Sequence, residues 1–271
     1  MESLQVITLG CSKNTVDTEH LLGALEGLYD IVPQGEQRQK IDNLIINTCG
    51  FIGDAKQESI DAVLEAVRLK SEGKVGKLTV VGCLSQRYMD SLPGLIPEVD
   101  SWFGARDFSR VARAFGAKGV VQSERFSSGA GHYAYLKISE GCNRHCSYCA
   151  IPLIRGKHVS VPIPELVSEA EALARRGVKE LIIIAQDSTF YGIDLYGKRT
   201  LRRLLGELSQ IEGIEWIRLH YAYPTGFPMD VLDEMASNPK ICKYLDIPLQ
   251  HIDDKVLLLC EGILPELPQG L

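Results

Sequence analysis

Residues 140–152 read EGCNRHCSYCAIP, and this stretch places three cysteines, Cys142, Cys146 and Cys149, in a C-x3-C-x2-C array. Three thiols within eight residues of a polar loop do not have the pattern of buried structural cysteines. A structural zinc site takes four ligands. His145 or His132 would have to be the fourth, because the chain has no second C-x2-C pair. A four-iron cluster held by three thiolates, which leaves one iron open, fits the count better.

The segments around this loop predict a series of strands and helices. A strand pattern ends just before the loop. After the loop, segments whose apolar residues have helical spacing alternate with segments whose apolar residues have strand spacing. Strands separated by helices imply a parallel sheet, so the second half predicts a partial βα barrel with four strands. The expected strands are 133–139, 178–186, 215–224 and 243–251, and the expected helices are 162–177, 199–213 and 228–238.

The first half shows the same alternation and predicts an open parallel α/β domain. Its expected strands are 4–11, 42–50, 77–84 and 101–105, and its expected helices are 17–28, 54–73, 85–92 and 107–115. A polar stretch near 123–132 is typical of a linker. The fold class is therefore α/β, with one domain over 1–122 and a second over 128–271, which suits a chain of 271 residues.

Three further cysteines follow strands of the first half. Cys11, Cys49 and Cys83 each come one or two residues after the last apolar position of a different strand. Parallel strands place their carboxyl ends along one edge of the sheet, where open α/β folds bind ligands. We therefore expect these three thiols to converge there.

Composition narrows the classes of function. The net charge of −6 disfavours strong nucleic-acid binding, which calls for a basic surface. Eight cysteines in a chain with no secretory signal favour metal binding or catalysis over disulfides. No apolar run approaches the ~20 residues of a membrane span. We expect a cytoplasmic protein without a membrane partner.

The cysteine loop resembles that of the radical S-adenosylmethionine enzymes. The resemblance implies that Cys142, Cys146 and Cys149 hold a [4Fe-4S] cluster whose open iron binds S-adenosylmethionine, and that Tyr148 lies near the adenine. With the first half included, the match narrows to the methylthiotransferases: it extends over LGCSKNTVDTE, NTCGFIGDAKQESI, VVGCLSQRY and LKISEGCNRHCSYCAIPLIRGKHVS. In that family Cys11, Cys49 and Cys83 would hold a second, auxiliary [4Fe-4S] cluster that carries the sulfur.

The resemblance also implies a reaction. The segments IIIAQDSTFYG and IRLHYAYPTGFP look like the branch that methylthiolates the β-carbon of an aspartate in ribosomal protein uS12. S-adenosylmethionine would serve as radical source and methyl donor, and a flavodoxin or ferredoxin as reductant. A tRNA adenosine methylthiotransferase and a non-catalytic or inactive iron–sulfur fragment remain as alternatives.

Other polar residues lie near the ends of the expected strands of the second half. Gln186 and Gln250 are taken as candidates to line the cofactor pocket. Arg155 and Gly156 match the family loop, although a solvated turn explains them almost as well. Cys242 and Cys260 have no evident partners and are interpreted as incidental thiols.

The resemblance ends near residue 257. The family would continue with the rest of the barrel and a small β-barrel domain of the TRAM type, whereas this chain reads LLCEGILPELPQGL and stops. The chain therefore looks truncated at its C-terminal end, and the resemblance leaves the activity of this polypeptide open.

Overall fold

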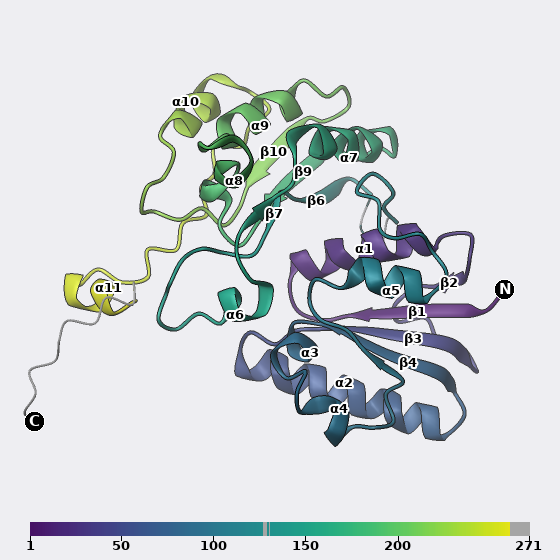
Figure 1. Ribbon diagram of the computed structural model, residues 1–271. Helices are drawn as coiled ribbons and strands as arrows, with labels where there is room; N and C mark the ends of the chain where they lie inside the picture. The colour runs from purple at the N-terminus through teal and green to yellow at the C-terminus, as the bar shows by residue number, and fades with distance from the viewer. Residues whose placement is uncertain (127–128, 130, 261–271) are drawn as a thin grey trace, which may run out of the picture. The chain divides into compact units, whose positions relative to one another are not determined.

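The computed structural model describes residues 1–126, 129 and 131–260, and the chain divides into two compact units (Figure 1). The first unit is Met1–Gly131 and the second is His132–Leu271. Part of the expected linker belongs to the first unit, because Arg125 Nε donates to Glu19 Oε2 at 2.6 Å. Residues 127, 128 and 130 of that linker, and the tail after residue 260, lie outside the described residues.

The first unit contains a five-stranded sheet in the order β2-β1-β3-β4-β5, and all its strand pairs are parallel. The four expected strands of this half are present. The edge strand β2 was not predicted, because its three residues are too few to show an alternating pattern. The strands are β1 Ser3–Thr8, β2 Asp30–Val32, β3 Ile41–Thr48, β4 Val75–Gly82 and β5 Ser101–Trp102.

Helices cover both faces of this sheet (Figure 1). Successive side chains of a strand point to opposite faces, so Ile45 of β3 packs with the helices of one face while Leu44 and Ile46 pack with those of the other. Helices α1 and α5 lie on the first face, and α2 and α4 on the second. The helices are α1 Ser12–Leu25, α2 Gly53–Ser71, α3 Cys83–Arg87, α4 Leu92–Leu95 and α5 Phe108–Ala114.

The second unit is built on a three-stranded parallel sheet in the order β10-β9-β6. Its core joins apolar residues of these strands to those of α7, α9 and α10. The sheet strands are β6 Tyr133–Lys137, β9 Glu180–Ile184 and β10 Trp216–Leu219. The helices are α6 Ile151–Arg155, α7 Ile163–Arg175, η1 Ser188–Phe190, α8 Ile193–Tyr196, α9 Leu201–Ser209, α10 Asp230–Ser237 and α11 Asp254–Cys260.

The fourth strand expected in the second half is absent from the described residues, and that prediction was wrong. Residues 243–251 form no strand, and only an isolated bridge between Ile217 and Ile241 continues the sheet beyond β10. Pro248 has no N–H to donate to a ladder. Leu249 is 69% exposed, so the apolar spacing of this segment does not mark a buried face.

The helices of the described residues do not combine the length and apolarity that a membrane span requires. The longest, α2, has 19 residues, and its Arg68 bonds to Glu65 and Glu72 on an exposed face. In the part of the chain that the structure describes, no helix is both long and apolar enough to cross a bilayer.

Candidate metal centres

The loop that carries Cys142, Cys146 and Cys149 is closed at its base by a small antiparallel pair of strands. Strand β7, Ser139–Glu140, pairs with β8, Val159–Ser160. Inside this pair, the N–H of Cys142 donates to the Gly156 carbonyl at 3.0 Å. The His158 N–H donates to Asn143 Oδ1 at 3.0 Å. The cysteines therefore lie on a loop whose two ends are held together, at the carboxyl end of β6.

The sulfur atoms of this loop lie in a partly desolvated, polar environment. The Arg144 N–H points at Cys142 Sγ, 3.4 Å away, and the Tyr223 hydroxyl lies 4.0 Å from Cys146 Sγ. Burial raises the pKa of the Cys142 thiol, and the nearby charge of Asp187 adds to this effect. Burial likewise raises the pKa of Cys149. A bound metal would favour the thiolate forms by contributing positive charge.

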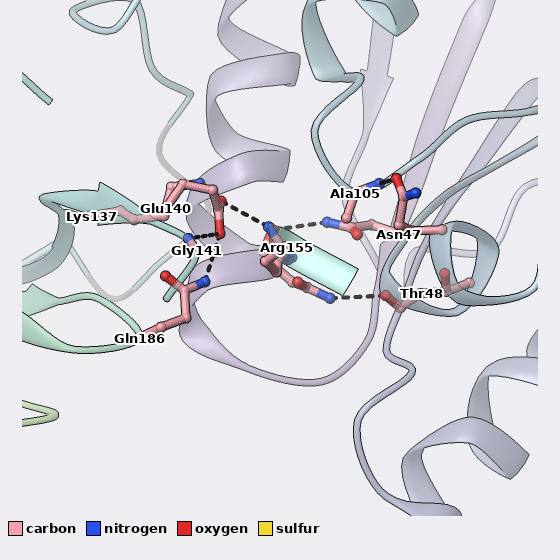
Figure 2. A network of polar contacts seen from close by, with 10 residues as sticks. Asn47, Thr48, Ala105, Lys137, Glu140, Gly141, Arg155 and Gln186 are labelled. Carbon is pink, nitrogen blue, oxygen red and sulfur yellow. Dashed lines mark hydrogen bonds and ion pairs between the residues drawn. The ribbon is translucent and has the colours of Figure 1, made fainter. Parts of the chain in front are cut away.

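Glu140, at the end of β7, is the centre of a polar network beside the cysteine loop (Figure 2). Its Oε2 accepts from Lys137 Nζ and from Arg155 Nη1, each at 2.9 Å. Its Oε1 accepts from Gln186 Nε2 at 2.6 Å and from the Gly141 N–H at 3.2 Å. Arg155 is thus a buried member of an ion pair, rather than the solvated turn that its sequence also allowed. The network joins β6, β7, α6 and the end of β9.

The protonation of Glu140 gives a testable pH dependence. Burial raises its pKa, but Lys137 and Arg155 outweigh burial and lower it from 4.5 to about 2. The resulting stability is present above pH ~4.5 and is lost as the pH falls through about 2. At pH 7 a Glu140→Gln variant should lose about 3 kcal/mol of unfolding free energy, because it removes the carboxylate from a buried ion pair.

Urea unfolding checks this expectation. Trp216 lies in the second unit and the other tryptophan, Trp102, in the first, so a Trp102→Phe background reports on the second unit alone. The gap between parent and Glu140→Gln should narrow between pH ~4.5 and 2. A constant gap over that range would contradict the assignment.

The two glutamines predicted to line a cofactor pocket take different positions. The Oε1 of Gln186 is buried and has no hydrogen-bond partner among the described residues, so an acceptor beside the network is left available to a donor. Gln250 Oε1 accepts from the Tyr148 hydroxyl at 2.7 Å. Tyr148 and Gln250, both predicted as cofactor residues, are therefore in contact. Gln250 also has a φ of 65°, in the left-handed region that residues other than glycine rarely adopt and where strained residues of functional sites are found.

The segment after Gln250 also contacts the cysteine loop. The Ser147 N–H donates to the Cys260 carbonyl at 3.0 Å, and its Oγ donates to the Leu259 carbonyl at 2.7 Å. Burial raises the pKa of Tyr148 to about 12, and Cys146 and Cys260 are among the neighbours that add to this shift. Helix α11 thus packs on the loop, a contact that the sequence did not indicate.

In the first unit, Cys11, Cys49 and Cys83 lie at the carboxyl edge of the sheet, as their spacing predicted. Cys49 and Cys83 directly follow the paired residues Thr48 and Gly82 of β3 and β4. Cys11 is the residue before α1 and follows β1. Gly10 approaches Cys49 closely: a Cβ on Gly10 would lie 2.8 Å from Cys49 Sγ.

Side chains of α1 and α2 hold this edge together. Ser59 of α2 is fully buried, and its Oγ accepts from the Cys49 N–H and donates to the Cys49 carbonyl, both at 2.9 Å. Asn14 Nδ2 of α1 donates to the carbonyls of Leu9 at 2.8 Å and Thr48 at 3.2 Å. The backbone at Cys49 is therefore anchored to a helix rather than free as a loop.

A Ser59→Ala variant tests this anchor. It should lower the unfolding free energy of the first unit by about 1–3 kcal/mol, because both bonds to the Cys49 backbone are lost in a buried place. Trp102 fluorescence in a Trp216→Phe background measures it. Ser71→Ala is the matched control, since the Ser71 Oγ bonds to the Arg68 carbonyl on the exposed side of the same helix. Equal losses in both variants would refute a special role for Ser59.

Both candidate donor sets consist of three thiols, and thiolates are the usual ligands of iron–sulfur clusters. Among the described residues, no three Cys, His, Asp or Glu side chains lie close enough to hold one ion. The thiolates of a four-iron cluster each bind a different iron, so they are spaced more widely than the ligands of a zinc ion. Each unit supplies three cysteines at the carboxyl edge of a parallel sheet, and this chemistry fits the group that the resemblance implies.

Comparison with known families defines the class of protein. Residues 136–266 match the Radical SAM superfamily, and residues 3–104 match a family described as Uncharacterized protein family UPF0004. The chain therefore contains a Radical SAM domain that follows a UPF0004 domain. Curated relatives similar to this chain include ribosomal protein uS12 methylthiotransferases, named RimO.

Three relatives illustrate the match. The protein of Flavobacterium johnsoniae is 54% identical over 257 residues, which cover 94% of this chain and 59% of the relative. That of Cytophaga hutchinsonii is 51% identical, with 96% and 60% covered. That of Porphyromonas gingivalis (strain W83) is 48% identical, with 94% and 59% covered. This chain spans about three fifths of the length of these relatives.

Solved structures share the fold at low sequence identity. The radical S-adenosylmethionine methyltransferase TsrM from Kitasatospora setae, solved with a substrate and a SAM analog, matches with a TM-score of 0.64 at 14% identity, covering 95% of this chain and 61% of that one. The cobalamin-dependent radical enzyme OxsB matches with a TM-score of 0.61 at 9% identity, with 96% and 45% covered. These matches support the fold alone.

Proposed function

We propose that the chain methylthiolates the β-carbon of an aspartate in ribosomal protein uS12. The observation that carries this proposal is the identity of 48–55% to curated uS12 methylthiotransferases along 94% of the chain. The two sets of three cysteines at strand ends support it, because the reaction calls for one cluster to start the chemistry and another to carry the sulfur.

The proposed cofactors are two [4Fe-4S] clusters and S-adenosylmethionine. When bound, they supply radical chemistry at an unactivated C–H bond, which acid and base side chains cannot perform. Cys142, Cys146 and Cys149 would hold one cluster, and Cys11, Cys49 and Cys83 the other. Tyr148, Gln186 and Gln250 would bind the S-adenosylmethionine, with the unpartnered Gln186 Oε1 available to accept from its amino group.

The remaining residues of the site hold these groups in place. The network of Glu140 with Lys137 and Arg155 fixes the start of the cysteine loop, and Arg144 braces the loop against Asp187. We further propose a flavodoxin or ferredoxin as electron donor, because the chemistry needs a strong one-electron reductant. We also propose a cytoplasmic location.

The test uses the full chain, reconstituted anaerobically with iron and sulfide. We expect S-adenosylmethionine to be cleaved to 5′-deoxyadenosine in the presence of a reductant. We also expect a thiomethyl group to be added to uS12, detected by peptide mass spectrometry. Cys242→Ala, which changes a cysteine outside both sets, is the matched control and should behave like the parent.

Two outcomes would overturn the proposal. A thiomethyl group found on bulk tRNA and not on uS12 would support the adenosine-modifying alternative. A chain that is loaded with both clusters but yields no 5′-deoxyadenosine would indicate a non-catalytic iron–sulfur protein.

A further inference from the structure

Three side chains from separate parts of the second unit form a line of contacts that ends on the sulfur of Cys146. Arg144 Nε donates to Asp187 Oδ2 at 2.9 Å. The Arg144 guanidinium carbon lies 3.9 Å from the centre of the Tyr223 ring. The hydroxyl of Tyr223 lies 4.0 Å from Cys146 Sγ.

The members of this line are held in place from several sides. Asp187 is 2% exposed, and its Oδ1 accepts from the Thr189 N–H at 3.0 Å. Arg144 Nη2 also donates to the Thr225 carbonyl at 3.0 Å. A guanidinium with two fixed partners has little freedom to leave the face of the Tyr223 ring.

The backbone before Tyr223 is strained in a way that helps to place it. Tyr221, just after β10, has a φ of 59°, which is rare for a residue with a large side chain. Hydrogen bonds fix this turn: the Tyr221 carbonyl accepts from the Ser188 N–H at 3.0 Å, and the Ala222 N–H donates to the Asp246 carbonyl at 2.9 Å. Strain maintained by surrounding contacts is a feature of functional sites.

The chemistry of a metal-bound sulfur fixes the direction of the last contact. A thiolate carries no proton, so the Tyr223 hydroxyl must be the donor and Cys146 Sγ the acceptor. Hydrogen bonds to the sulfur ligands are one of the features that set the reduction potential of a cluster. Such a bond stabilises the added electron and so raises the potential. The cation over the ring withdraws electron density from the phenol and makes it a better donor.

We propose that Tyr223 is a positioning residue that raises the reduction potential of the cluster held by Cys142, Cys146 and Cys149, and that Arg144 orients and polarises it. This inference rests on the proposed function, because it takes that cluster as given. It adds a determinant of how easily the cluster accepts an electron from its donor.

The experiment uses the full chain with Cys11, Cys49 and Cys83 changed to alanine, so that only the second unit binds a cluster. In this parent we compare Tyr223→Phe, Arg144→Lys and the matched control Tyr244→Phe. Tyr244 also has an arginine, Arg218, near its ring face, 5.5 Å from the centre. Each protein is titrated with dithionite and mediators, and the reduced cluster is followed by electron paramagnetic resonance.

We expect Tyr223→Phe to bind as much iron as the parent and to have a more negative midpoint potential. It should also lose one exchangeable proton coupling in the pulsed resonance spectrum of the reduced cluster. Arg144→Lys should shift the midpoint in the same direction by less, and Tyr244→Phe should not shift it.

An unchanged midpoint in fully loaded Tyr223→Phe, or an equal shift in Tyr244→Phe, would overturn the inference. If Tyr223→Phe fails to load, Arg144→Lys decides, since it retains Tyr223; a midpoint equal to that of the parent would then refute the proposal. A parent that binds no cluster would instead refute the ligand set of the proposed function.

Discussion

A Cys149→Ala chain, reconstituted anaerobically, is expected to bind about four irons where the unchanged chain binds about eight. The loop would keep only two of its three thiolates, and two ligands do not hold a four-iron cluster against loss to solvent. The other set lies in a separate compact unit with its own core, so its cluster should remain. Cleavage of S-adenosylmethionine should be abolished.

Iron and sulfide analysis measures this result, and the reductive cleavage assay gives the second readout. Cys260→Ala provides an instructive comparison. Cys260 bonds to Ser147 of the loop through its backbone carbonyl, which the substitution keeps. Removal of the Cys260 sulfur should therefore leave the iron content unchanged. Full loading of Cys149→Ala would show that the three cysteines of this loop are not the ligands.

Gly10→Ala is expected to remove the other cluster and to destabilise the first unit. Gly10 has a φ of +88°, which costs an alanine about 1–2 kcal/mol. The new Cβ would also lie 2.6 Å from Cys49 Cβ, closer than real contacts allow, so Cys49 would be displaced. We expect the iron content to fall to about four per chain.

Gly27→Ala separates the two effects. Gly27 lies in the same unit with a φ of +80°, and an added Cβ there meets nothing within 4 Å. This control should lose stability but keep its iron. If both variants retain about eight irons, the contact between Gly10 and Cys49 does not define a ligand position.

Much of the fold follows from local patterns that the sequence displays. Short apolar, β-branched runs predicted β1, β3 and β4, and the parallel order of these strands explains why Cys49 and Cys83 follow paired positions at one edge. Apolar spacing was misleading at 243–251, because Leu245, Ile247 and Leu249 are apolar but the backbone of this segment forms no ladder. Periodicity shows which side chains of a segment are apolar. It does not show whether the backbone of that segment pairs with a neighbouring strand.

The parts of the site that the sequence did not indicate depend on contacts between distant residues. The β7 and β8 strands have two residues each, too few for any pattern. Arg144 contacts Asp187 and Tyr223, and both of these residues belong to later βα units. The sequence also left open whether Arg155 is solvated, because it does not show that Arg155 and Glu140 form an ion pair. Cysteine spacing was more informative because the three cysteines of the loop are neighbours in the chain.

The pairing of β7 with β8 has a further consequence for how metal is captured. The thiols of the second unit lie on one short closed loop, so after the first sulfur binds, the others meet the metal at a high effective concentration. The thiols of the first unit come from three separate strand ends and are gathered only while the sheet is intact. During gradual denaturation the first unit should therefore release its iron before the second unit does. The order of iron loss would show which set of thiols is close in the sequence and which is brought together by the fold.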